Sequence, residues 1–145
     1  MTIMRSILIL FVGSILAMQN SVLSAEAADA DVVVIAHASV PSMDAQLLSR
    51  LYTGRAVSVG DTPVTVVNAA VGSDLRNRFL GKYLQQDDRK YRAYWMVRRH
   101  VGKGIPPREF QTVSEMIEYV QRTPGAIGYV ESSDVKPGLH IVLRL

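Results

Sequence analysis

The stretch TPVTVVNAAVGSDLRNRFLGKYL, residues 62–84, decides the fold of this chain. Its first part is a β-branched run behind Pro63, which is typical of a buried strand over 64–67. A tight turn at Gly72 follows, and Ser73 is placed to cap a helix whose apolar residues share one face: Leu75, Phe79, Leu80, Tyr83 and Leu84. A strand that enters a helix through a Gly-Ser turn points free backbone N–H groups at the end of a sheet. Anions and small ligands are commonly held at such a place.

The first 27 residues have the features of a secretory signal. Arg5 supplies a short positive region, residues 7–18 form an apolar run, and Ala25-Glu26-Ala27 fits a small-residue cleavage site. An uncleaved N-terminal anchor is the alternative. We therefore expect a signal peptide over 1–27, a periplasmic protein, and one mature domain over 28–145 that is long enough to bury a core.

The sequence lacks the residues and motifs that several kinds of functional site require. The chain has no cysteine, which excludes disulfide bonds, a lipid-modified N-terminal cysteine and a thiolate metal site. Its three histidines, His37, His100 and His140, have no metal-ligand spacing, and no catalytic triad order, paired carboxylates or glycine-rich nucleotide loop stands out. The sequence predicts a non-enzyme without metal or cofactor.

The charge is unevenly distributed. Residues 76–108 carry ten Lys and Arg against two acidic residues, Asp87 and Asp88. Solvated helix surfaces are the favoured interpretation, and a face for an anion, an acidic lipid or an acidic partner is the alternative. No nucleic-acid-binding motif accompanies the basic residues, so a nucleic-acid partner is not expected.

The remaining patterns predict alternating strands and helices. Strands are expected at 32–36, 64–67, 126–130 and 140–145, and helices from Ser42 to about Tyr52, from Ser73, from Asp87 or Asp88, and behind a Thr112–Glu115 capping box. Gly128 inside a strand indicates close approach by a neighbour or a ligand. Tyr91, Tyr94 and Trp95 share a helix face and are expected to pack in the core. This order predicts an α/β fold with a mainly parallel sheet flanked by helices.

Four segments carry a resemblance to a known family. They are VVVIAHASVP at 32–41, LLSRLYTGRAVSVGDTPVTVVN at 47–68, GSDLRNRFLGKYL at 72–84 and TPGAIGYVESS at 123–133, and YRAYWMVRRHVGKGIPP at 91–107 adds to them. In this order they resemble the phosphate-binding proteins of bacterial ABC transporters, of the type 2 periplasmic binding protein class. The chain is similar to short members that look like one lobe of the usual two.

The resemblance implies a ligand site at the start of the helix after the second strand. The family motif is Arg, three residues, then Ser-Gly-Thr, and it falls on Ala69, Ser73, Asp74 and Leu75, so that only the serine is kept. Arg76 is a candidate to supply the missing positive charge. The expected ligand-binding residues are Ser39, Asn68, Gly72, Ser73, Asp74 and Arg76. Ser39 and Asn68 are included because they lie at the ends of predicted strands. Four of them, Ser39, Asn68, Gly72 and Ser73, also have a purely structural interpretation as turn or cap residues.

Two functions follow from these observations. The first is periplasmic binding of a small oxyanion, phosphate by resemblance, for ABC-type uptake or sensing. The second is a ligand-free interaction module that docks on an inner-membrane transporter or sensor through the basic face between Arg76 and Arg108. A single lobe buries less of a ligand than a closed cleft, so tight binding is expected to need a second copy or another protein. The oligomeric state is left open.

Overall fold

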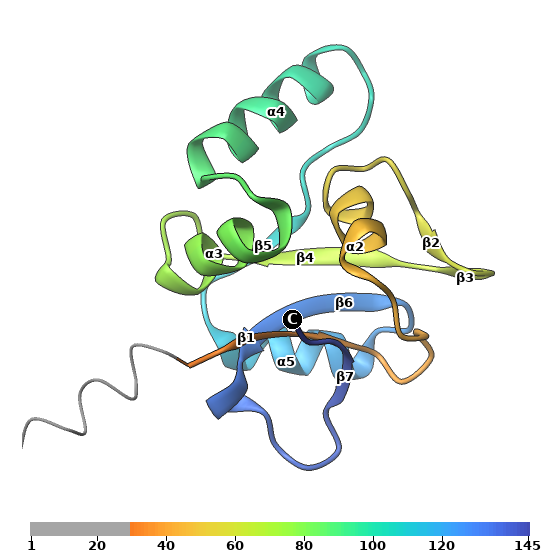
Figure 1. Ribbon diagram of the computed structural model, residues 1–145. Coiled ribbons are helices and arrows are strands. Elements are labelled where there is room, and N and C mark those ends of the chain that lie inside the picture. The colour runs from red at the N-terminus through yellow and green to blue at the C-terminus, as the bar shows by residue number, and fades with distance from the viewer. Residues whose placement is uncertain (1–29) are drawn as a thin grey trace, which may run out of the picture. The chain divides into compact units, whose positions relative to one another are not determined.

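The structure is a computed structural model that describes residues 30–145, so the predicted signal peptide over 1–27 and its cleavage site lie outside the described residues. Five strands form one sheet in the order β5-β4-β6-β1-β7 (Figure 1). Their bounds are β1 Val32–Ala36, β4 Thr65–Ala69, β5 Arg108–Phe110, β6 Ala126–Glu131 and β7 His140–Leu143. Strand β4 is parallel to β5 and β6, whereas β1 is antiparallel to both β6 and β7. Four of the five strands therefore run the same way, which confirms the mainly parallel sheet.

The helices begin where short polar side chains can accept a backbone hydrogen bond. Their bounds are α2 Ala45–Tyr52, α3 Asp74–Phe79 with a π-helical continuation η1 Leu80–Leu84, α4 Asp88–His100, α5 Val113–Arg122 and the 3₁₀ turn η2 Ser132–Asp134. Ser73 caps α3, Asp87 caps α4, and Thr112 forms the predicted capping box with Glu115. A small hairpin, β2 Ser58–Val59 and β3 Thr62–Pro63, precedes β4.

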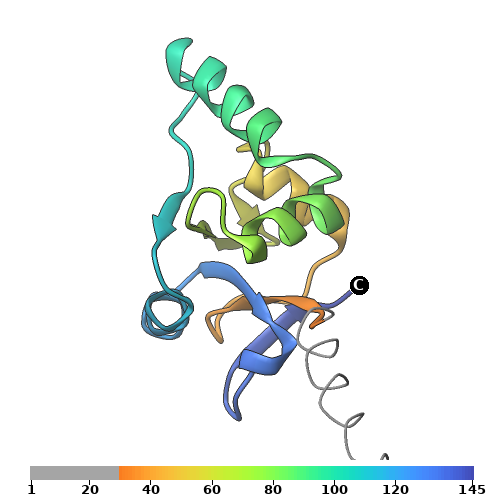
Figure 2. The same ribbon diagram turned by 90° about the vertical axis from the view of Figure 1, so that its left-hand side faces the viewer.

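Helices cover both faces of the sheet. On one face the ring of Tyr129 stacks on Phe79 of α3 at 3.8 Å between centroids, and Tyr52 of α2 packs against the same pair. Because side chains alternate along a strand, Gly128 faces the other way, where an added Cβ would lie 2.9 Å from Met116 Sδ of α5. Figure 2 shows α5 end-on, on the opposite side of the strands from α2 and α3. The close approach predicted at Gly128 is confirmed, and the neighbour is a helix.

Helix α4 is attached mainly through the carbonyl end of α2. Four of its side chains donate hydrogen bonds to the last carbonyls of that helix and to the residues just after it. The pairs are Tyr91–Tyr52 at 2.9 Å, Trp95–Tyr52 at 3.2 Å, Tyr94–Thr53 at 2.7 Å and Arg98–Gly54 at 3.1 Å. These groups satisfy acceptors that a helix end leaves unpaired. The expected core packing of the aromatic residues is confirmed for Tyr91 and Trp95, which are buried.

Two predictions about the elements were wrong. Ser42 does not cap α2, because Asp44 Oδ1 accepts the backbone N–H of Leu47 at 2.7 Å instead. Strand β5 was missed, since its three residues behind Pro106-Pro107 are too few to show an alternating pattern.

Two glycines with positive φ allow a direct test of the packing between β6 and the hairpin. Gly125 has φ +80° and an added Cβ would lie 2.4 Å from the carbonyl oxygen of Pro63, whereas Gly138 has φ +90° and open space. Gly138→Ala should cost about 1 kcal/mol through backbone strain alone. Gly125→Ala should cost about 3 kcal/mol or more, because the clash is added to that strain. Urea unfolding of the two variants measures both values, and equal losses would contradict the packing described here.

Candidate functional site

The carboxyl edge of the sheet contains a topological switch point. Strand β4 leads into α3 on one face, and its parallel neighbour β5 leads into α5 on the other face. Ala69 and Phe110 are register partners at the ends of the two strands, so the starts of both helices lie beyond the same edge. Open α/β sheets bind ligands in the crevice that such a divergence creates. We give the name switch-point crevice to the region beyond this edge, between the turn at residues 71–73 and the turn at residues 111–112.

The turn Gly72-Ser73 forms one side of the crevice. Gly72 has φ +77°, and no atom lies within 4 Å of the place where a Cβ would stand. Ser73 Oγ accepts the backbone N–H of Arg76 at 3.3 Å, so the predicted cap is confirmed. Asp74 follows at the first helical position with a side chain that is 82% exposed and that pairs with Arg78. The turn therefore offers backbone donors and a hydroxyl, together with one exposed carboxylate.

Arg76 is buried and paired with two carboxylates of its own chain. The residue is 1% exposed. Its Nε lies 2.7 Å from Asp88 Oδ1 at the start of α4, and its Nη1 lies 2.7 Å from Glu109 Oε1 of β5 and 3.1 Å from the carbonyl oxygen of Ala69. Burial alone would lower its pKa, but the hydrogen bond to Glu109 and the charges of Asp88 and Glu109 outweigh burial and raise it. We call these three charged residues the Arg76 cluster. The guanidinium thus lies beside the position of the missing motif arginine, yet two carboxylates neutralise it.

Asn68 is buried within a polar network rather than turned toward solvent. It is 1% exposed, its Nδ2 donates to Tyr91 Oη at 3.2 Å, and its Oδ1 accepts from Tyr129 Oη at 3.0 Å. The backbone N–H of Ala69 donates to Tyr129 Oη, and Tyr91 Oη donates to the carbonyl oxygen of Tyr52. The network joins α2, β4, α4 and β6 beneath the crevice. Both polar atoms of the Asn68 side chain are therefore engaged in this buried network.

Ser39 lies at the other end of the sheet. It follows β1, which runs antiparallel to β6, and its Oγ accepts the backbone N–H of Gly125 just before β6 begins. Its hydroxyl also bonds His37 Nδ1 at 2.8 Å. The structure therefore brings Gly72, Ser73 and Asp74 together, places Asn68 and Arg76 beneath them, and separates Ser39 from all five.

Arginine and lysine side chains near the crevice form ion pairs within the chain. Arg78 pairs with Asp74 and with Glu131, and Lys82 pairs with Asp31. The hydrogen bond to Lys82 holds the pKa of the Asp31 carboxyl below its usual value. An anion in the crevice would thus meet backbone N–H groups, hydroxyls and a helix terminus, with no unpaired arginine from α3.

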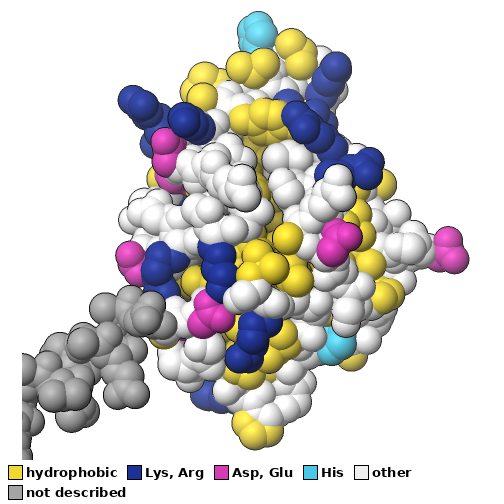
Figure 3. Space-filling model, viewed as in Figure 1, with side chains coloured by type: hydrophobic (Ala, Val, Ile, Leu, Met, Phe, Trp, Pro, Cys, Tyr) yellow, Lys and Arg dark blue, Asp and Glu magenta, His cyan; other side chains and the backbone are white. Residues whose placement is uncertain are grey.

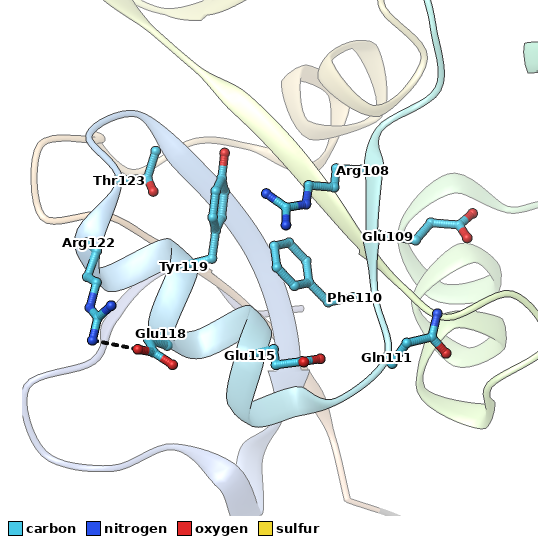
Figure 4. A pocket seen from close by; sticks show the side chains of 9 residues that line it. All are labelled: Arg108, Glu109, Phe110, Gln111, Glu115, Glu118, Tyr119, Arg122 and Thr123. Carbon is cyan, nitrogen blue, oxygen red and sulfur yellow. Dashed lines mark ion pairs between the residues drawn. The ribbon is translucent and has the colours of Figure 1, made fainter.

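Two cavities not expected from the sequence flank β5. The larger, of about 440 Å³, lies between β5 and α5 (Figure 4), where the guanidinium of Arg108 covers the rings of Phe110 and Tyr119 at 4.7 and 5.4 Å. Glu109 points to the other side of the strand in that view, toward the Arg76 cluster. The second, of about 260 Å³, lies where the Arg76 cluster meets α4; Asn68, Tyr91, Trp95, Met96 and Pro106 line much of it.

One signal for the Arg76 cluster was present in the sequence. Arg76 precedes Phe79, Leu80 and Tyr83 by three, four and seven residues, so it falls on the buried face of its helix. A buried arginine requires carboxylate partners. Glu109 could not be predicted as a partner of Arg76, because its strand was not predicted.

Within residues 30–145, no group of three or more His, Cys, Asp or Glu side chains is arranged to hold a metal ion. In the same range, no helix has the length and apolar character needed to cross a membrane.

Solved structures share this fold. No protein-family model matches the chain, and no curated protein matches it. An ABC-type phosphate transport receptor from Vibrio cholerae is similar with a TM-score of 0.54 and 13% identity over 77% of this chain and 45% of that one. A putative phosphate ABC transporter substrate-binding protein from Clostridium perfringens, solved with bound phosphate, has a TM-score of 0.54 and 20% identity over 77% and 44%. PstS from Borrelia burgdorferi has a TM-score of 0.57 and 15% identity over 77% and 46%.

The chain spans less than half the length of each of these structures. It therefore has the α/β fold of one lobe of the phosphate-receptor class, as the sequence resemblance implied. At such low identity the likeness establishes the fold alone.

The Arg76 cluster predicts a graded loss of stability. Asp88→Asn should lower the free energy of unfolding by about 3 kcal/mol, because it leaves a buried guanidinium with half of its compensation. Glu109→Gln should cost less, about 1–2 kcal/mol, since its side chain is 37% exposed and water can replace it. Glu118→Gln, which breaks the exposed pair with Arg122, is the control and should cost under about 0.5 kcal/mol. Urea unfolding measures all three, and an Asp88→Asn loss no greater than the control's would contradict the cluster's role.

The buried phenols predict a loss of stability at alkaline pH. Burial raises the pKa of Tyr52 and of Tyr129, and in the unfolded chain both return to an ordinary value near about 10. The unfolded state therefore loses protons that the folded state keeps, so the contribution of these two phenols to stability is constant below about pH 9 and falls as the pH rises through about 10. Thermal unfolding across this range, with tyrosinate absorbance recorded in parallel, tests the point. Ionisation of all six tyrosines near pH 10 in a protein that stays folded would contradict it.

Proposed function

We propose that this chain is a solute-binding lobe that works outside the cytoplasm and holds a small oxyanion, with phosphate as the first candidate, in the switch-point crevice. The observation that carries the proposal is the divergence of α3 and α5 from the adjacent parallel strands β4 and β5. This geometry directs two helix starts at one place beyond the sheet. The solved structures that share the fold support the choice of ligand, since one of them holds phosphate.

The recognition groups are donors from the two turns. Of the backbone N–H groups from Gly72 to Leu75, that of Ser73 donates to the carbonyl oxygen of Ala70 at 3.1 Å, which leaves those of Gly72, Asp74 and Leu75 without a partner in the helix itself. The Ser73 hydroxyl can donate its proton while its oxygen caps the helix. Thr112 stands at the start of α5 on the other side of the crevice; its backbone N–H donates to Glu115 Oε2 at 3.1 Å, so its hydroxyl is the donor that it can offer. These donors bind an oxyanion by hydrogen bonds and involve no covalent step, so the proposed role is not enzymatic.

The charges around the crevice leave the chain with only part of an anion-binding site. The cations nearest the crevice are paired within the chain, and Asp74 adds an exposed negative charge at its mouth. A single lobe also leaves one side of the ligand in water. We therefore propose that the second wall comes from another copy or from a transporter or sensor protein, and that the isolated chain binds phosphate only weakly, at millimolar concentration.

Isothermal titration at low salt tests this function on a chain that begins at Ala28, which keeps the entire core between Val32 and Val142. Phosphate should bind weakly to the parent protein. Asp74→Asn should tighten binding about fivefold, because it removes a carboxylate that repels the anion. Ser73→Ala should weaken binding about threefold to tenfold, because one hydrogen bond is lost.

Ser42→Ala is the matched control, since Ser42 is exposed and caps no helix. It should leave the affinity unchanged. Ser73→Ala should also lower stability by about 1 kcal/mol through loss of the cap, so its fold is checked by circular dichroism. A folded Asp74→Asn protein that gives no heat with phosphate would overturn the proposal and favour the ligand-free docking module.

A further inference from the structure

Exposed apolar side chains gather at the end of α4. Among residues 30–145, seven large hydrophobic residues are exposed, and four of them lie between positions 96 and 105. These four, Met96, Val97, Val101 and Ile105, are exposed by 72%, 63%, 57% and 75%, and we call them the α4 tip. In Figure 3 hydrophobic side chains lie over this end of the protein, with Lys and Arg on either side. Such a cluster marks an interaction surface.

Cations without carboxylate partners lie at both ends of α4, with Arg99 and Lys103 beside the tip and Arg89 and Lys90 in the first turn of the helix. Residues 89–108 contain seven Lys and Arg and no Asp or Glu. Within the described part of the chain, Arg92 is the one cation of these seven that forms a salt bridge. Arg98 donates to backbone carbonyls and Arg108 lies over aromatic rings. The other four, Arg89, Lys90, Arg99 and Lys103, are exposed and are called the α4 collar. The cations of the preceding helix differ, since Arg76, Arg78 and Lys82 are each paired with carboxylates. The positive charge of α3 and η1 is therefore paired with carboxylates, whereas that of the α4 collar is not.

We infer that the α4 tip and collar dock the protein on the surface of a bilayer that contains anionic phospholipid. Basic residues around an apolar end of a helix are the features that bind such surfaces: the apolar side chains enter the boundary of the acyl chains, and the cations stay among the phosphates. The inference does not depend on a ligand in the switch-point crevice.

The shape and charge of the tip select this occupant over the others. Met96 and Val97 are consecutive, so their side chains leave the helix about 100° apart; Met96 lines the cavity beside Trp95, and Val97 is not part of that lining. A fluid bilayer adapts to apolar side chains that point in different directions, whereas a protein partner would need a surface that matches each of them. A second copy of the chain would bring two unpaired collars together, which like-charge repulsion opposes.

Vesicle flotation tests the inference with the chain from Ala28, which lacks the apolar run of residues 7–18. Vesicles of phosphatidylcholine with phosphatidylglycerol should bind the protein at low salt, and vesicles of phosphatidylcholine alone should not. Arg99→Gln with Lys103→Gln should reduce the partition coefficient about 25-fold, because each cation near an anionic surface contributes about a factor of five. Val97→Ser with Val101→Ser should reduce it about tenfold.

Matched controls separate the tip from general charge and hydrophobicity. Lys136→Gln with Arg144→Gln removes the same charge from exposed positions around β7, at the sheet edge opposite β5, and should change binding less than about threefold. Leu145→Ser removes an apolar residue of similar exposure, 54%, and should have no effect. No binding to the anionic vesicles, or equal losses in the α4 and control variants, would overturn the inference. The first of these results would point instead to an acidic protein surface.

Discussion

The rest of the structure depends on the contacts that the buried guanidinium of Arg76 makes. One side chain that is 1% exposed connects the end of β4, the start of α4 and the edge strand β5 through Ala69, Asp88 and Glu109. An arginine in this position requires both carboxylates, because an unpaired buried charge costs several kcal/mol. It therefore holds β5, which has only three residues, against β4. That pairing in turn creates the switch point where α3 and α5 diverge.

The same interaction explains how this chain departs from the two-lobed receptors whose fold it shares. The family motif places an arginine at the position of Ala69, and here a different arginine reaches the backbone of that residue from the following helix. The charge of Arg76 is paired with carboxylates inside the protein, and Asp74 adds a negative charge on the surface. The crevice keeps its helix starts and hydroxyls but has no free cation from α3. Under the proposed function, recognition then rests on backbone donors, and a second wall must supply the remaining contacts. Further along the chain, the cations of the α4 collar are exposed and form no salt bridge.

Local patterns were enough to predict most of the fold. The strands around Val33 and Val67, the cap at Ser73 and the capping box at Thr112 each follow from a few neighbouring residues, and the structure confirms all of them. The tertiary pairings could not be predicted in this way. Burial of Arg76 was readable from its helix face, but its partner Glu109 stands in a strand without a sequence signal. The position of Ser39 depended on the direction of β1, and a strand pattern does not say whether its neighbour is parallel or antiparallel.

The central claim is that an oxyanion is held between the starts of α3 and α5. A phosphate titration of the uniformly ¹⁵N-labelled chain from Ala28, followed by amide chemical shifts, tests it most directly. The account predicts saturable shifts confined to the first turn of α3, from Gly72 to Leu75, and to the start of α5 around Thr112 and Val113. Shifts centred on the cations of α4, or no saturable shifts at millimolar phosphate, would contradict it.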